Sequence, residues 1–398
     1  PTTVSNTTST IGKANLAVAM SSQNKTYDGT TAAALATGAI TATGVTVDGV
    51  AETATVSKAS GTYNSKNVAT ATTVTASLAT GDFTAATGTD LSNYNLPTTV
   101  SNTTSTIGKA NLAVAMSSQN KTYDGTTAAA LATGAITATG VTVDGVAETA
   151  TVSKASGTYN SKNVATATTV TASLATGDFT AATGTDLSNY NLPTTVSNTT
   201  STIGKANLAV AMSSQNKTYD GTTAAALATG AITATGVTVG GVAETATVSK
   251  ASGTYNSKNV ATATTVTASL ATGDFTAATG TDLSNYNLPT TVSNTTSTIG
   301  KANLAVAMSS QNKTYDGTTA AALATGAITA TGVTVDGVAE TATVSKASGT
   351  YNSKNVATAT TVTASLATGD FTAATGTDLS NYNLPTTVSN TTSTIGKA

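Results

Sequence analysis

The sequence contains no cysteine, no histidine and no tryptophan, and all of its basic residues are lysine. Without cysteine, the chain can form neither disulfides nor thiolate metal sites. Without histidine, it lacks the usual general base and the commonest metal ligand. Carboxylates and lysines could still catalyse a reaction, but all charged residues together make up only 9% of the chain. The composition therefore predicts a protein that is not an enzyme and that needs no cofactor.

Clusters of positive charge and long apolar runs are also missing. The formal net charge is −2 at pH 7, whereas binding to nucleic acid requires clustered basic residues that neutralise phosphates. The longest apolar run lies near "AAALA", far below the roughly 20 residues that a transmembrane helix needs. We therefore expect neither a nucleic-acid partner nor membrane insertion by this segment.

Proline is rare, and its positions reveal how the chain is organised. The five prolines recur every 96 residues, and the whole sequence follows the same period (Pro1, Pro97, Pro193, Pro289 and Pro385). Only one position differs between the copies, being aspartate in three of them and glycine in the third copy (Asp48, Asp144, Asp336 and Gly240). A solenoid coil is much shorter, at roughly 20–50 residues, so this period indicates a tandem array of small domains.

The domain boundaries are expected between Ala14 and Asn15, where two strand-like runs meet. This placement gives four complete repeat domains and assigns residues 1–14 to the last strand of a preceding repeat. The four domains then comprise residues 15–110, 111–206, 207–302 and 303–398.

Alternating apolar and polar residues predict β-strands. In "NVATATTVTASL", Val68, Val74 and Leu78 share one face if the segment is extended. Asp48-Gly49 fits a two-residue hairpin turn that needs positive φ at both positions. The best helix candidate, "TTAAALA", is too short to be stable alone. We therefore predict an all-β chain of tandem immunoglobulin-like sandwiches forming an elongated rod, with another small mostly-β domain such as a β-grasp as the alternative.

One stretch, "TDLSNYNLP", supports the immunoglobulin-like prediction within the all-β class. Asp90 and Tyr94 are spaced as in the tyrosine corner of immunoglobulin-like domains, where the tyrosine hydrogen-bonds back to a nearby backbone group. Leu96 would lie where antibody domains have cysteine. We predict that Tyr94 forms such a corner.

The motifs "KTYDGTTAA", "GTYNSKNVATATTVT" and "GTDLSNYNL" resemble the YDG repeat of large bacterial surface proteins, including secreted adhesins of the filamentous-haemagglutinin type. The resemblance covers nearly the whole period, although Tyr63 stands where the family more often has phenylalanine. It implies an extracellular location, on the cell surface or in a secreted matrix. In physical terms, Asp28 and Gly29 are expected to form a turn, with Tyr27 as a lid at one end of the sandwich. Alternatively, Tyr27 stacks on a sugar.

Three sharper possibilities receive less weight. Asp82, Asp90 and Asn93 could offer oxygen ligands to calcium, but their spacing matches no calcium loop, so no metal site is predicted. Lys25 could form an isopeptide bond with Asn93 or Asn95, assisted by Asp90. Alternating threonines also occur on ice-binding solenoids, but here we interpret them as ordinary outward-facing strand residues.

The leading functional hypothesis is a structural segment of an adhesin or matrix fibre that acts as a stalk or filament-building unit in adhesion or biofilm. Its partners would be neighbouring repeats, and fibres or bundles would form by self-association. The alternative is a multivalent module with one weak glycan site per repeat, since identical copies also favour avidity.

Overall fold

The computed structural model describes residues 2–398, and these residues contain β-strands and short 3-10 turns but no α-helix. The all-β prediction is therefore confirmed. The helix candidate "TTAAALA" contains a strand instead, β4 (Ala32–Ala34), because its backbone pairs with a neighbouring strand. The described residues form no helix of the length and apolarity that a membrane span requires.

Each repeat contains the same twelve strands and two 3-10 turns. The turns of the first repeat are η1 (Thr80–Asp82) and η2 (Leu91–Asn93). Its strands are β1 (Ala14–Asn15), β2 (Ala17–Met20), β3 (Asn24–Thr26), β4, β5 (Ile40–Val47), β6 (Val50–Val56), β7 (Ser60–Tyr63), β8 (Val74–Ser77), β9 (Phe83–Ala85), β10 (Tyr94–Asn95), β11 (Thr99–Asn102) and β12 (Thr106–Gly108). The elements of the other repeats follow at intervals of 96 residues.

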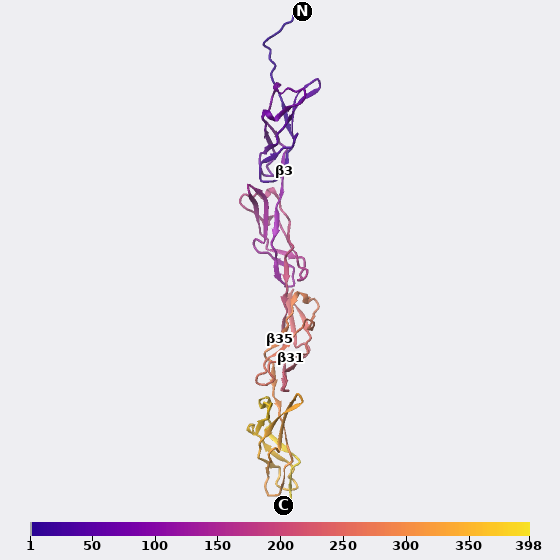
Figure 1. Cartoon of the computed structure of the whole chain (residues 1–398), viewed down its shortest axis with the longest axis vertical. Helices are drawn as coiled ribbons and strands as arrows, with labels where there is room; N and C mark the ends of the chain where they lie inside the picture. Colours follow the sequence, from indigo (N-terminus) through magenta and orange to yellow (C-terminus); the bar gives the residue numbers. More distant parts are fainter. Residues whose placement is uncertain (1) are drawn as a thin grey trace. The chain divides into compact units, whose positions relative to one another are not determined.

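Two four-stranded antiparallel sheets form the body of the first repeat. Their strand orders are β2-β5-β6-β9 and β4-β7-β8-β11, and the edge strands β2 and β11 contact each other. Two short parallel pairs, β1 with β10 and β3 with β12, complete the repeat. The third repeat has the same order, in which β31 (Ser252–Tyr255) and β35 (Thr291–Asn294) pair with the two edges of β32 (Val266–Ser269). Figure 1 labels β31 and β35. This arrangement is compatible with a sandwich, and the immunoglobulin-like topology stays a prediction.

The core lies between these sheets and follows the alternation of the sequence. Val74 and Ala76 on β8 are fully buried, whereas the threonine and serine beside them are exposed. The strand is shorter than the alternation predicted, because Val68 belongs to a turn. The Asn64 side-chain oxygen accepts hydrogen bonds from the backbone amides of residues 72 and 73. These bonds replace regular strand pairing before Val74.

The hairpin between β5 and β6 has the expected turn. Asp48 and Gly49 have φ values of 53° and 83°. In the third repeat, Gly240 and Gly241 adopt 58° and 84°. The single substitution between repeats therefore leaves this turn unchanged.

The chain divides into two compact units, Pro1–Lys121 with Thr126–Gly204, and Thr122–Gly125 with Lys205–Ala398. In the first unit, β12 pairs with β3 of the first repeat, and β13 (Ala110–Asn111) pairs with β22 (Tyr190–Asn191) of the second. Only Lys109 separates β12 from β13. The predicted boundaries at 14/15 and its equivalents stay a prediction.

Candidate functional site

The tyrosine of the motif "YDG" lies at the joint between two repeats. Tyr27 follows β3, and its backbone N–H donates to the carbonyl of Gly108 at 2.8 Å. Its side chain is only 2% exposed, and its hydroxyl donates to Oε1 of Glu148 in the second repeat at 2.8 Å. Its ring meets that of Tyr190 edge to face, with centroids 5.4 Å apart. Tyr27 therefore contacts the next repeat rather than covering its own.

Glu148 connects two tyrosines that belong to different repeats. It lies on β18 (Val146–Val152) and is 8% exposed. Its Oε1 accepts from Tyr27, and its Oε2 accepts from Tyr190 at 2.5 Å. The Tyr190 hydroxyl in turn accepts from the Val141 amide at 3.0 Å. A buried carboxylate is tolerated only when its oxygens are hydrogen-bonded, so Glu148 depends on both repeats.

The electrostatics of the joint favour the neutral tyrosines. Burial and then the hydrogen bond to Glu148 raise the pKa of Tyr27 well above its ordinary value. The same two causes raise the pKa of Tyr190 to about 12. Both hydroxyls therefore stay protonated and donate to the carboxylate over the whole physiological range.

Asp28 and Gly29 form the turn that follows Tyr27. The Asp28 carboxylate accepts from the Thr30 amide at 2.9 Å and from the Lys25 ammonium at 2.7 Å. Burial opposes ionisation of Asp28, but the bonds from Lys25 and Thr30 prevail and lower its pKa. Gly29 has a φ of +79°, and a Cβ there would lie 2.1 Å from Cγ2 of Val143 on β17 (Ile136–Val143). Glycine is therefore required both by its own turn and by the next repeat.

A second set of bonds crosses the same joint. Asn189 is completely buried, and its Oδ1 accepts from the Val68 amide of the first repeat at 2.9 Å. Its Nδ2 donates to Oδ1 of Asn67 at 3.2 Å. Since Val68 and Asn67 lie in the turn before β8, this turn also contacts the second repeat.

The second unit contains the same arrangement between its own repeats. The Tyr219 hydroxyl donates to Glu340 at 2.9 Å, and its ring meets that of Tyr382 at 5.4 Å. A Cβ on Gly221 would lie 2.1 Å from Val335. Within the same unit, Tyr123 donates to Glu244 at 2.9 Å. The joint is thus a repeated feature of the chain.

The first and last repeats show what the joint covers. Tyr315, the equivalent of Tyr27 in the fourth repeat, is 43% exposed. In the part of the chain that the structure describes, nothing lies within 4 Å of a Cβ on the equivalent glycine, Gly317. In the first repeat, Val47 is 53% exposed, whereas its equivalent Val143 is partly covered. Tyr315 and Val47 are therefore more exposed than their equivalents that contact another described repeat.

Tyr94, which is predicted to form a tyrosine corner, bonds to a backbone group and to a glutamate. Its hydroxyl accepts from the amide of Val45, 49 residues upstream on β5, and donates to Glu52. The corner of the immunoglobulin-like type stays a prediction. The geometry needs a residue without a side chain on β5, since a Cβ on Gly44 would lie 2.4 Å from the Tyr94 hydroxyl.

The residues considered for calcium have other roles. The Asp82 carboxylate accepts from the Ala79 amide at 2.8 Å and from Lys58 at 3.4 Å, and both bonds lower its pKa. Asp90 caps η2 by accepting from Ser92 at 2.9 Å. Asn93 is the equivalent of the buried Asn189. Among residues 2–398, no three histidine, cysteine, aspartate or glutamate side chains form a group that could hold a metal.

The residues considered for an isopeptide bond are also engaged elsewhere. The Lys25 ammonium contacts Asp28 and the carbonyls of Thr30 and Ala32, and it lies 5.4 Å from the centre of the Tyr63 ring. The amide of Asn95 donates to Asn15 at 3.0 Å.

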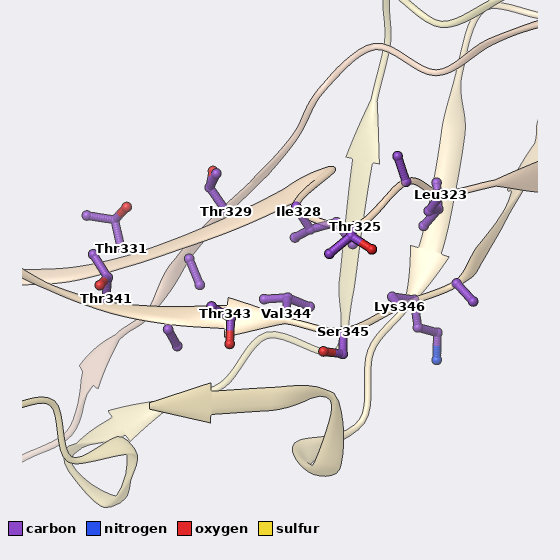
Figure 2. A pocket seen from close by; sticks show the side chains of 15 residues that line it. Leu323, Thr325, Ile328, Thr329, Thr331, Thr341, Thr343, Val344, Ser345 and Lys346 are labelled. Carbon is purple, nitrogen blue, oxygen red and sulfur yellow. The ribbon is translucent and has the colours of Figure 1, made fainter. Parts of the chain in front are cut away.

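An open pocket of about 670 Å³ lies along β41 (Ile328–Val335) and β42 (Val338–Val344) of the fourth repeat (Figure 2). Threonine and alanine side chains make up most of its lining. Its one charged residue, Lys346, pairs with Asp370 at 3.2 Å.

Sequence reasoning did not single out Glu148 or Val143 as contacts between repeats. For the glutamate one signal was present, since each repeat contains a single glutamate. A lone glutamate within an otherwise apolar and hydroxyl-rich strand favours a buried, partnered carboxylate.

A family model described as "YDG domain" matches the chain four times, over residues 12–104, 108–200, 204–296 and 300–392. No curated protein matches the chain significantly. Among solved structures, one described as giving insight into host cell surface retention of a 1.5-MDa bacterial ice-binding adhesin is 13% identical. The match covers 73% of this chain and 100% of that one, with a TM-score of 0.17.

Proposed function

Because the chain belongs to the YDG domain family, and because its repeats share buried joints, we propose that it is a structural segment of an extracellular bacterial adhesin or matrix fibre. It acts as a stalk or filament-building unit in adhesion or biofilm and is not an enzyme. The observation that carries this proposal is the contact of Tyr27 with Glu148 and Tyr190. A repeat that supplies a buried partner to its neighbour restricts how the two can move.

The glycan-binding alternative has less support from the residues. Sugar stacking requires an exposed ring, and Tyr27 is only 2% exposed. Across residues 2–398, Tyr315 is the only tyrosine or phenylalanine that is not buried. Repeated weak glycan sites would therefore have to form without aromatic platforms.

The test measures how the end-to-end distance of the segment increases with the number of repeats. The chain is displayed on a bacterial surface with a fluorescent reporter at its far end, in versions with four and eight repeats. Localisation microscopy then measures the distance from reporter to membrane. A stiff stalk should double this distance, whereas a flexible chain should increase it only by about the square root of two. Square-root scaling would contradict the proposal.

A further inference from the structure

The two parallel strand pairs join the beginning of a repeat to its end. In the first repeat, β1 pairs with β10, 80 residues later, and β3 pairs with β12, 82 residues later. Every pair within the two four-stranded sheets of this repeat is antiparallel. The same two parallel pairs recur in the third and fourth repeats. Parallel pairing is thus confined to the segments where the chain enters and leaves a repeat.

The direction of these pairs determines how they respond to tension along the chain. Only Lys109 separates β12 from the next repeat, so tension pulls β1 and β3 by their N-terminal ends and β10 and β12 by their C-terminal ends. In a parallel pair these ends lie at opposite ends of the pair, and the bonds between the strands are loaded together in shear. In an antiparallel pair the pulled ends would lie side by side, and the bonds would open one at a time.

The two parallel pairs also shield the interior of the repeat. Tension that enters at β1 reaches β12 either through β10 or through β3. Neither route follows the chain from residue 28 to residue 93, which contains all strands from β4 to β9. This shielded segment therefore carries tension only after both parallel pairs have separated.

Side chains add to the bonds between β3 and β12. In the backbone, the Thr106 amide donates to the Gln23 carbonyl at 3.2 Å, and the Tyr27 amide donates to the Gly108 carbonyl at 2.8 Å. The Asn24 side-chain oxygen accepts from both the amide and the hydroxyl of Thr106, each at 2.9 Å. One asparagine on β3 thus contributes two further bonds to β12.

Buried groups hold the same pair from the core side. The hydroxyl of Tyr63, on β7, donates to the Gln23 carbonyl at 2.7 Å and lies 3.2 Å from the Thr106 carbonyl. The Gln23 amide donates to the hydroxyl of Ser105 at 3.0 Å. Tyr63 and Ile107 are each 2% exposed, and Ser105 is fully buried. Water therefore has little access to one side of these bonds.

We propose that each repeat is a load-bearing unit in which the pairs β1–β10 and β3–β12 form a mechanical clamp against tension along the chain. Asn24 and Tyr63 reinforce this clamp. The one position that differs between repeats lies in the turn between β5 and β6, outside the clamp. Because the clamp sequences are identical, repeats in series resist the same load.

This inference rests on the proposed structural role and adds the force that the segment withstands. The experiment with four and eight repeats measures stiffness without load, and it depends on the joints between repeats. Resistance to load depends on the strand pairs inside each repeat. Either property can therefore fail while the other is observed.

The test stretches the whole 398-residue chain from its two ends and measures the unfolding rate of single repeats at constant force. The wild-type chain should lengthen in four steps of equal size. Asn24→Ala, introduced together with the same change at its equivalents, removes two bonds across each clamp. It should increase the unfolding rate under load about tenfold. The equivalents are Asn120, Asn216 and Asn312.

Asn64→Ala, again made in all four repeats, is the matched control. Asn64 is also exposed, and its side-chain oxygen also accepts two bonds, but from amides within the shielded segment. It should lower the free energy of unfolding in denaturant but change the unfolding rate under load by less than about twofold. Equal increases of the rate under load for the two variants would overturn the proposal.

A change of attachment points tests the clamp without removing any of its bonds. Val50 and Val338 are each 71% exposed, and cysteines at these positions provide handles. Load then enters the first and fourth repeats through β6 and its equivalent, whose partners are antiparallel. We expect two steps at lower force and two at the force of the unaltered chain. Four steps at one force would show that the direction of loading does not matter, which also overturns the proposal.

Discussion

Tyr27 and Glu148 lie 121 residues apart in the sequence, and the hydroxyl of one donates to the carboxylate of the other at 2.8 Å. This bond joins the "YDG" motif of one repeat to a strand of the next. It also explains why Tyr27 is buried although it lies at the end of its own repeat.

Loss of Glu148 should destabilise the joint more than loss of Glu52 destabilises the first repeat. Glu148→Ala leaves the buried hydroxyls of Tyr27 and Tyr190 without their acceptor, whereas Glu52→Ala affects only Tyr94. An unsatisfied buried polar group costs about 1–3 kcal/mol, so the two variants should differ by roughly that amount. Denaturant unfolding of residues 1–204, which contain both sites, measures the difference. Equal losses would show that the bond from Tyr27 contributes nothing.

A methyl group on Gly29 should be harmful for two reasons that can be separated. Gly29→Ala places an L-residue at positive φ, which costs about 1–2 kcal/mol, and also directs its Cβ at Val143. In a fragment of residues 1–204, Gly125→Ala incurs the same strain but has no third repeat to meet. We expect Gly29→Ala to cost a further 1–3 kcal/mol or so, as overpacking does. The melting temperatures of the two variants provide the comparison.

Alkaline pH should weaken the joint. The pKa of Tyr190 is raised to about 12 in the folded chain, whereas an unperturbed tyrosine has a value of about 10. The stabilisation is therefore fully present below about pH 10 and is lost as the pH rises through the folded value. Unfolding free energies of residues 1–204 measured from pH 8 to 12 should fall over this window. The fall should be shallower in a Tyr27→Phe, Tyr190→Phe variant, and an identical fall would contradict the assignment.

Calcium should not affect folding. The Asp82 carboxylate is engaged by Ala79 and Lys58, and Asp90 caps a turn. We expect the same melting temperature in excess chelator and in millimolar calcium. A large drop in chelator would point to a site that includes Asp82 or Asp90.

Much of the fold could be predicted from the sequence because it depends on local patterns. The 96-residue period is visible when the copies are compared, and the alternation around Val74 and the turn at Asp48 follow from neighbouring residues. The start of β8 at Val74 could not be predicted from alternation. It depends on hydrogen bonds from two backbone amides to the Asn64 side chain, which lies earlier in the chain. Alternation alone does not register such a bond.

The joint could not be predicted, for a reason specific to identical repeats. Glu52 lies 25 residues after Tyr27, and Glu148 lies one full period further. The sequence surroundings of the two glutamates are the same, so no pattern indicates which one Tyr27 meets. Only the structure shows that the partner lies in the next repeat. The sequence pattern alone therefore favours a lid on the same repeat for Tyr27.

The most direct test of the account is the spread of distances between the first two repeats. The chain contains no cysteine, so Val50→Cys and Val146→Cys introduce two unique label sites. Both positions are 71% exposed, and each lies next to the hairpin turn of its repeat. Pulsed electron resonance between attached spin labels should give one narrow distance distribution, which broadens when Glu148→Ala is added. A distribution that is broad from the start, and that Glu148→Ala leaves unchanged, would contradict a joint held by Tyr27 and Glu148.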